Sequence, residues 1–431
     1  MSNKIVNWGK TYECKPSAIL YPKSNEETID IIQQANKKGR KVRVIGSGHS
    51  WTALVPTNDI LISLDAYQGI IESDHQQMTA TVKAGSKLHS IFSALQHEGM
   101  ALANQGDIDV QSLAGAFTSG THGTGRDFGI LATFIEEITL VQGNGELITC
   151  SETNHPELFR AARVSLGALG IITEMKIKTT KNFKLEYISK GGTLEDVMVN
   201  FDNYIQSNRN FEFYWFPFTG LVQMKLVNET DDPIRSGGFI RELNDIFVEN
   251  IGYGALSELS KNWAWWTPHF SKFSADYVPK GRWVNWSHKI FATKRWVRFR
   301  EMEYSIPRNH FEDCMYEIVK TIHDKKFRVH MPMEVRYVKA DDIMISPANG
   351  RDSVYMAVHQ YMGMEYKEYF TTIEKIFLKY EGRPHFGKMN TLAYDGFKSA
   401  HPHWNQFISI RNECDPQQVM INPYLKGIFN L

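Results

Sequence analysis

The stretch "MEVR", residues 333–336, sets an acidic and a basic side chain two residues apart in an otherwise apolar run. Residues two apart on a β-strand project from the same face, so Glu334 and Arg336 would lie side by side. The carboxylate can accept hydrogen bonds from hydroxyl groups and the guanidinium can donate a fork of them, which suits a polyhydroxylated ligand. A structural ion pair on a sheet surface gives the same pattern, so these residues alone leave both interpretations open.

The stretch "VRVIGSGHSW", residues 42–51, is a second candidate. A short β-branched run ends in Gly-Ser-Gly, and a histidine and a tryptophan follow at once. Glycines allow the backbone to approach a ligand closely, so this turn could present the imidazole of His49 to a bound molecule. A loop histidine with satisfied hydrogen bonds is the alternative. A Rossmann dinucleotide site is not supported, because "GSGHSW" lacks the third glycine of G-x-G-x-x-G.

A second glycine-rich segment, "GAFTSGTHGTGRDFG", spans residues 115–129. Its glycines alternate with small hydroxyl residues, so many backbone N–H groups can crowd against an anion such as a pyrophosphate. The chain has neither a Rossmann order nor a P-loop lysine. The two glycine-rich segments therefore indicate a dinucleotide held by another architecture.

These candidates need elements to position them. Ser24 caps a predicted helix, Glu27 completes a capping box, and Gly39 ends the helix just before a strand at 42–45. Two glycines around Asn144 predict a hairpin. From about residue 183 the sequence shows longer polar–apolar alternation, clusters of tryptophan and fewer glycines, so we place a domain boundary there. Further strands are predicted at "ILISLD", "TATVKAGS" and "LGALGIITEMKIKT", and helices at 87–98 and "HPELFRAAR".

Composition narrows the classes of function. With 431 residues the chain is long enough for two domains. Lys plus Arg and Asp plus Glu number 48 each, so no net positive charge attracts nucleic acid or anionic lipid, and neither is an expected partner. No segment reaches the length of a membrane span and the first residues do not look like a signal peptide, which favours a soluble protein.

The cysteines and histidines do not suggest metal ligation. Cys14, Cys150, Cys314 and Cys414 are far apart, which fits a reduced cytoplasm. Neither His310 with Cys314 nor the histidines at 401 and 403 have further ligands at zinc-like spacing, so no metal is expected. We expect the aromatic residues between 211 and 300 to be core and sheet faces. The tryptophans at 263–266 could instead form a dimer surface; subunit number stays open.

Taken in order, the motifs resemble a known family. "VRVIGSGHSW" followed by "NQGDIDVQSLAGAFTSGTHGTG" is similar to the FAD domain of vanillyl-alcohol-oxidase-type flavoproteins, and within them to the aldonolactone oxidase and alditol oxidase group. "PMEVRYV", "GRPHFGK" and the tail from "PHWNQ" match that group's late motifs. The resemblance implies an α+β fold: a PCMH-type FAD-binding domain from residues 1–182, completed by 395–431, and a cap domain at 183–394 with a large antiparallel sheet.

The resemblance also implies how FAD is held. His49 would be the covalent anchor to the flavin 8α carbon, since a neutral imidazole can attack there. His122 is expected to position backbone rather than do chemistry. The residues implied to bind the cofactor are His49, Gly46, Ser47, Gly48, Ser50, Gly106, Asp107, Ser112, Gly115, Gly120, Thr121, His122, Gly123, Gly125, Ile171 and Lys388.

The catalytic residues implied are Glu334, Arg336, Lys388 and His359. Lys388 corresponds to the lysine at the flavin N1 and C2 carbonyl edge, where a cation stabilises the charge that develops when hydride reaches N5. His359 is a candidate for a base or a hydroxyl contact, with a core histidine as the alternative, because the family's histidine aligns with Ala357. His385 is expected to be a packing partner.

Two neighbouring positions concern the electron acceptor and the substrate. Gly106 lies where family oxidases carry a small residue before the flavin C4a, which favours oxygen as acceptor. Asp107 lies where relatives more often have Ser, and a carboxylate there would disfavour anionic substrates. The sequence thus predicts an FAD-dependent oxidase of a sugar 1,4-lactone or related polyol that yields hydrogen peroxide. An alditol oxidase, a same-fold dehydrogenase and a non-catalytic flavin- or sugar-binding protein are the alternatives.

Overall fold

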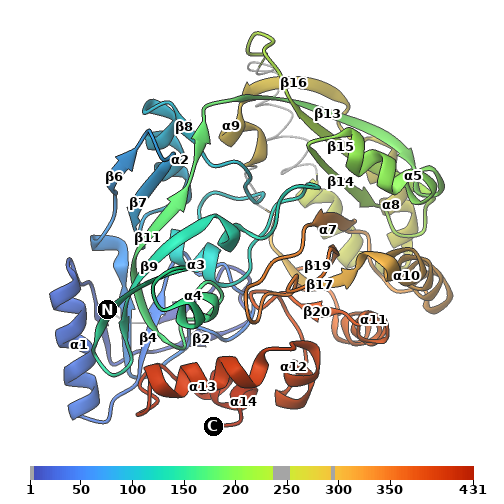
Figure 1. Ribbon diagram of the computed structural model, residues 1–431. Helices are drawn as coiled ribbons and strands as arrows, with labels where there is room; N and C mark the ends of the chain where they lie inside the picture. The colour runs from blue at the N-terminus through green and yellow to red at the C-terminus, as the bar shows by residue number, and fades with distance from the viewer. Residues whose placement is uncertain (1–3, 236–252, 293–296) are drawn as a thin grey trace.

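The computed structural model describes residues 4–235, 253–292 and 297–431 (Figure 1). The first part of the chain forms a five-stranded antiparallel sheet, ordered β10-β9-β11-β7-β6, and a three-stranded parallel sheet, ordered β3-β5-β4. Two short pairs, β1 with β2 and β8 with β12, flank them. The strands are β1 (Ile5–Val6), β2 (Glu13–Cys14), β3 (Ala18–Leu20), β4 (Val42–Ile45), β5 (Ile60–Ser63), β6 (Ile70–Asp74), β7 (Thr79–Lys83), β8 (Met100–Ala101), β9 (Ile135–Gln142), β10 (Leu147–Ser151), β11 (Gly170–Lys178) and β12 (Thr180–Lys181).

The local predictions for this part are confirmed. The Ser24 hydroxyl accepts from the Glu27 N–H at the start of α1, and Gly39 follows the helix with a φ of 62°. The Glu27 carboxylate accepts from the Lys23 N–H at 2.7 Å, one residue earlier than a standard capping box. β9 and β10 pair as the predicted hairpin. The helices are α1 (Asn25–Lys37), α2 (Leu88–His97), α3 (Leu113–Thr118) and α4 (Pro156–Ala162).

The last stretch of chain packs against this first part. Figure 1 shows the red C-terminal helices beneath the blue and teal elements, and their apolar residues belong to the same buried cluster as those of β5, β7 and β9. The Arg43 guanidinium donates to the Met420 carbonyl at 2.6 Å, and Asn422 donates to the Ala53 carbonyl at 2.9 Å. The helices are α12 (Tyr394–Ala400), α13 (Trp404–Cys414) and α14 (Pro423–Phe429).

The middle of the chain forms an eight-stranded sheet in which every pair is antiparallel, ordered β16-β13-β15-β14-β18-β19-β17-β20. It begins directly after our predicted boundary near residue 183, although that division into domains stays a prediction. The strands are β13 (Lys184–Thr193), β14 (Asn210–Trp215), β15 (Leu221–Glu229), β16 (Gly281–Trp286), β17 (Phe299–Pro307), β18 (Met333–Val338), β19 (Ser353–Tyr361) and β20 (Arg383–Pro384).

One face of this sheet is covered by helices and is apolar. Side chains of α5, α10 and α11 form a second buried cluster with alternate residues of β14, β17, β18 and β19. Figure 1 shows these three helices on the outer side of the sheet. The opposite face is therefore free to carry polar groups. The helices of this region are α5 (Leu194–Ser207), α7 (Tyr253–Asn262), α8 (Thr267–Asp276), α9 (Ser287–Phe291), α10 (Phe311–Lys325) and α11 (Lys367–Lys379).

The expectation that the aromatic residues form core is right for β14 and wrong for the tryptophans at 263–266. Phe213 and Trp215 are buried, whereas Trp263, Trp265 and Trp266 are exposed where α7 meets α8. Part of the aromatic stretch falls outside the described residues. All four cysteines are free and buried. Among the described helices, none combines the length and the apolar character needed to cross a membrane.

Candidate functional site

A cavity of about 640 Å³ lies where the first part of the chain meets the polar face of the large sheet. Its size is in the usual range for a small-molecule or cofactor site. Both regions supply its wall, so residues far apart in sequence converge here. The predicted residues that line it are Gly46, Ser47, Gly48, His49, Ser50, Gly106, Asp107, Ser112, Gly115, Thr121, His122, Ile171, Glu334, Arg336, His359 and Lys388.

The turn after β4 forms one side of the cavity. Gly48 has a φ of 69°, a conformation that favours glycine, and a Cβ at Gly46 would overlap the Ser112 hydroxyl. The Ser47 hydroxyl donates to the Val110 carbonyl at 2.6 Å, and Lys87 donates to Ser47 at 3.3 Å. The backbone here thus comes close to the start of α3. This wall consists of main chain and small hydroxyl groups, with a cation behind it.

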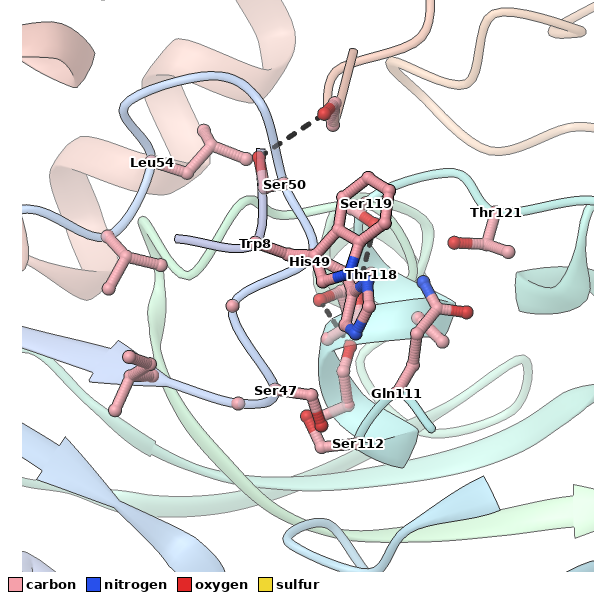
Figure 2. Close-up of a pocket in the computed structure, with 18 of the residues that line it drawn as sticks. Trp8, Ser47, His49, Ser50, Leu54, Gln111, Ser112, Thr118, Ser119 and Thr121 are labelled. Atoms are coloured by element: carbon pink, nitrogen blue, oxygen red, sulfur yellow. Dashed lines mark hydrogen bonds between the residues drawn. The ribbon is translucent and has the colours of Figure 1, made fainter. Parts of the chain in front are cut away.

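The His49 ring stacks on Trp8, with centroids 5.8 Å apart and planes 25° from parallel (Figure 2). Burial, together with the ammonium groups of Lys388 and Lys87, lowers the pKa of His49 to about 4. The imidazole is therefore neutral at physiological pH and keeps a nitrogen lone pair. Trp51 fixes the turn to the opposite wall, because its backbone N–H donates to the Gly387 carbonyl at 2.7 Å.

Three of the predicted cofactor residues do not reach the cavity: Gly120, Gly123 and Gly125. The N–H of Gly125 donates to the Tyr337 carbonyl at 2.9 Å, and a Cβ on Gly125 would lie 2.7 Å from the Arg209 carbonyl oxygen. A Cβ at Gly123 would overlap the Gln105 carbonyl, while Gly120 faces Pro347. Gly125 allows close packing between the two regions of the chain, and Gly123 allows close packing against Asn104 and Gln105 within the first part.

Arg336 lies at the centre of an ion-pair network on the polar face of the sheet. Its Nε contacts Glu212 at 2.6 Å, and its Nη2 contacts Asp107 at 2.5 Å and also Glu334. Lys225 holds the second oxygen of Glu212 at 2.8 Å. Although burial opposes charge, Asp107, Glu212 and Glu334 raise the pKa of Arg336 well above its ordinary value. The prediction that Glu334 and Arg336 share a face is confirmed.

Tyr214 connects two carboxylates of this network. Its hydroxyl donates to Glu334 and lies 3.3 Å from Asp107. Burial, then the negative charges of Asp107 and Glu212, raise the pKa of Tyr214 well above its ordinary value, so the hydroxyl keeps its proton.

Lys388 belongs to a neighbouring group. Its ammonium contacts the Glu301 carboxylate at 2.5 Å and lies 4.7 Å from the centre of the Trp51 ring. Burial alone would raise the pKa of Glu301, but Lys388 and His359 lower it to about 2. The His359 ring contacts Glu301 at 3.5 Å through Nε2 and the Pro332 carbonyl at 2.9 Å through Nδ1. Glu301 thus contacts both Lys388 and His359 and fixes these two predicted catalytic residues at the cavity wall.

His122 and His385 lie deeper. Both His122 nitrogens face acceptors, the Gly123 carbonyl at 2.8 Å and the Glu303 carboxylate at 3.0 Å. Burial would raise the pKa of Glu303, yet His122 holds it far below its usual range. His385 accepts from the Gly387 N–H at 2.9 Å, and burial lowers the pKa of His385 to about 3. His385 lines the cavity besides packing.

Sequence reasoning missed Glu212, Tyr214, Glu301 and Glu303. Each follows the same rule that identified "MEVR": polar residues two apart in an apolar strand, here in "FEFYWF" and "FREMEYSIP". Trp8, the other omission, carries no sequence signal, since it reaches His49 only through folding.

Two groups of side chains have the spacing of metal ligands: Glu301, Glu334 and His359, and Asp107, Glu212 and Glu334, each with ligand atoms within 4.8 Å of one another. Glu212, Glu334 and Asp107 already contact Arg336, and Glu301 contacts Lys388. Cationic side chains thus already occupy the positions beside these carboxylates that an ion would take.

Comparison with known proteins agrees with this geometry. Residues 175–428 match the family described as D-arabinono-1,4-lactone oxidase, and residues 16–151 match an FAD binding domain. The chain belongs to the D-arabinono-1,4-lactone oxidase family. It is 34% identical over 429 residues to the L-gulono-1,4-lactone dehydrogenase of Mycobacterium tuberculosis, with 99% of each chain covered. It is 31% identical over 437 residues to the L-gulonolactone oxidase of Bos taurus, covering 99% of this chain and 98% of that one.

Solved structures confirm the predicted vanillyl-alcohol-oxidase-type fold. Cholesterol oxidase from Brevibacterium sterolicum aligns with a TM-score of 0.83 over 100% of this chain and 97% of its own, at 17% identity. At that identity the likeness concerns the fold alone. The chain is therefore an α+β flavoprotein oxidoreductase of the sugar 1,4-lactone oxidase and dehydrogenase family with an FAD-binding domain.

Proposed function

We propose that this protein oxidises a hydroxyl-bearing carbon of a sugar 1,4-lactone, or of a related polyol, and uses oxygen as the final electron acceptor. The supporting observation is that a single cavity joins the glycine turn carrying His49 to the charged wall that contains Glu334, Arg336 and Lys388. One wall suits a dinucleotide and the other suits a hydroxylated substrate.

The residues present fit FAD. At Gly46 any side chain would overlap Ser112, so the bare backbone of the turn lies close to the start of α3, an arrangement in which main-chain N–H groups can face a diphosphate. Lys87 contacts Ser47 at 3.3 Å and is paired with Asp65 at 2.8 Å, so an ammonium group lies directly behind that position. FAD, when bound, supplies the ring that accepts the hydride. We assign its binding to Gly46, Ser47, Gly48, Ser50, Gly106, Ser112, Gly115, Thr121, His122 and Ile171, all of which line the cavity.

The charged wall would bind and orient the substrate. The carboxylate of Glu334 accepts hydrogen bonds from hydroxyl groups, and Arg336 holds that carboxylate in place. We assign to Lys388, fixed by Glu301 and Trp51, the stabilisation of negative charge that develops during oxidation. His359, beside Glu301, is the candidate to take the hydroxyl proton or to contact the hydroxyl.

A covalent link to FAD through His49 is part of the proposal. Its support is a neutral imidazole, with its pKa lowered to about 4, on a turn stacked against Trp8. Acid precipitation of the purified protein tests it, because a covalent flavin stays in the pellet and a free one turns the supernatant yellow. The His49→Ala variant should release its flavin under the same treatment. A wild-type supernatant that turns yellow refutes the link and leaves the fold untouched.

The electron acceptor is the least constrained element, since one relative is named a dehydrogenase and another an oxidase. Gly106 favours oxygen, because it lines the cavity without a side chain. Turnover of L-gulono-1,4-lactone in air should consume oxygen and release hydrogen peroxide in equal amounts. Equal turnover in air and under argon with an added dye would instead favour a dehydrogenase.

Anaerobic mixing with lactones and polyols tests the reaction itself. A true substrate bleaches the yellow flavin within one turnover. Faster bleaching by alditols than by lactones would favour an alditol oxidase. Failure of all of them would favour a protein that binds flavin or sugar without catalysis.

A further inference from the structure

The network around Arg336 holds more carboxylates than cations. Asp107, Glu212 and Glu334 contact the guanidinium, and Lys225 contacts Glu212. At their ordinary charges, three carboxylates therefore face two cations. Glu212, Glu334 and Arg336 are buried, so water and salt screen this excess of negative charge poorly.

We propose that Asp107 makes this wall select the uncharged, ring-closed lactone over its ring-opened hydroxy acid. The inference rests on the proposed function and names the form of the substrate. A 1,4-lactone is an internal ester. Its hydrolysis by one water gives an open-chain acid that keeps the other hydroxyl groups, gains a hydroxyl at C4 and, after loss of a proton, carries one carboxylate. An enzyme in water meets both forms, and their largest difference is that negative charge.

Arg336 is the group that would otherwise attract such a carboxylate. A guanidinium binds a carboxylate best through two parallel N–H groups. Here Nε is engaged by Glu212, and Nη2 by Asp107 and Glu334. The edge that these two nitrogens form is already filled by the protein's own carboxylates. The charged wall consequently favours the binding of ligands that donate hydrogen bonds, and it repels anions.

Asp107 differs from the other two carboxylates in where it comes from. Glu212 and Glu334 are on adjacent strands of the large sheet, whereas Asp107 lies on the loop between β8 and α3. Glu212 is paired with Lys225 as well as Arg336, while Asp107 lines the cavity with its side chain 20% exposed. Removing the Asp107 charge would leave two carboxylates for two cations and would free part of Nη2 for a ligand.

The test compares Asp107→Asn with wild type by calorimetric titration with L-gulonate and with L-gulono-1,4-lactone. The holoenzymes are kept anaerobic with their flavin already reduced, so that the lactone binds without being oxidised. Wild type should bind the lactone at least about tenfold more tightly than the gulonate, and the variant should lose most of that preference, mainly by binding gulonate better. Asp127→Asn, the same charge change at an exposed residue, should leave the preference as in wild type. If Asp107→Asn does not fold, Asp107→Ser serves as the second variant.

Failure of this inference and failure of the proposed function give different experimental results. A preference in both Asp107 variants that stays within twofold of wild type overturns the inference while lactone oxidation stands. Tighter binding of gulonate than lactone by wild type also overturns it. If wild type neither binds nor oxidises any lactone, the proposed function fails and the inference fails with it.

Discussion

The two walls of the cavity are built in different ways. Along residues 46–50 and the start of α3, the wall is main chain and small hydroxyl groups, and its shape depends on Gly46 and Gly48. Across β14, β18, β19 and β17, the wall is charged side chains that hold one another, with Arg336 and Glu301 as the two centres. We expect substitutions in the first wall to impair function by changing its shape, and substitutions in the second wall to impair function by changing its charge.

The largest effect is expected at the charged wall. Replacing Lys388 by Met should slow anaerobic bleaching of the flavin by lactone at least about 100-fold, because the cation that stabilises developing charge is lost. Lys388→Arg, which keeps the charge, should retain more activity. Stopped-flow absorbance measures the rate. Near-normal bleaching by Lys388→Met would remove this residue from the mechanism.

The same variant leaves Glu301 buried without its cation, so the free energy of unfolding should fall by about 3 kcal/mol. Urea titration measures this loss separately. The loss has to be known before the bleaching rate is interpreted.

The next largest effect should be a loss of shape at the backbone wall. In Gly46→Ala the new methyl group overlaps the Ser112 hydroxyl, so the turn must move away from α3. We expect the FAD content per chain after gel filtration to fall at least about tenfold. Gly427→Ala is the matched control, because a Cβ there meets nothing within 4 Å. Full FAD content in Gly46→Ala would show that the turn does not fix the cofactor.

A smaller steric change, at Gly106, should affect reoxidation of the flavin by oxygen more than its reduction by lactone. A Cβ at Gly106 would lie 3.3 Å from both the His122 carbonyl oxygen and the Thr121 methyl group, which is tight without being an overlap. Gly106→Ala should slow reoxidation by oxygen about tenfold and slow reduction by lactone less than that. Rapid mixing of reduced enzyme with oxygenated buffer gives the reoxidation rate. An unchanged rate would mean that Gly106 does not control access of oxygen.

The smallest effect on the reaction itself is expected at His385, whose influence is on stability as the pH changes. Burial lowers the pKa of His385 to about 3, whereas the unfolded chain has a pKa near 6.5 for histidine. Between these values the unfolded state binds the extra proton, so stability is lost as pH falls from about 6.5 toward 3. This amounts to about 1.4 kcal/mol for each pH unit between the two pKa values. The free energy of unfolding of His385→Asn should therefore fall less steeply over this range; parallel curves would contradict the shift.

The backbone wall was largely predictable because its signals are local. The strand β4 and the Gly-Ser-Gly turn that follows it both come from neighbouring residues. In the charged wall, the pair Glu334 and Arg336 has such a local signal, because it depends on the periodicity of one strand. The charged wall was only half predictable. Glu212 faces Arg336 across strands 124 residues apart in sequence, and no local pattern states that β14 pairs with β18.

The differences between sequence and structure have a related cause. Glycines that line a cavity and glycines in close-packed contacts have the same sequence signature, so Gly123 and Gly125 could not be told apart from Gly46. Aromatic residues are equally ambiguous. Trp215 is buried in the sheet while Trp265 is exposed, and composition does not predict which of the two is buried.

The contact between Arg43 and Met420 has a consequence for biosynthesis. These residues are 377 positions apart, and Arg43 lies in the strand that leads into the glycine turn. The turn is therefore synthesised long before the C-terminal segment that contacts Arg43, and the whole large sheet is translated in between. We therefore expect the turn to reach its final geometry only late in translation. Until Met420 emerges, the apolar residues that α12 to α14 later cover remain available to chaperones.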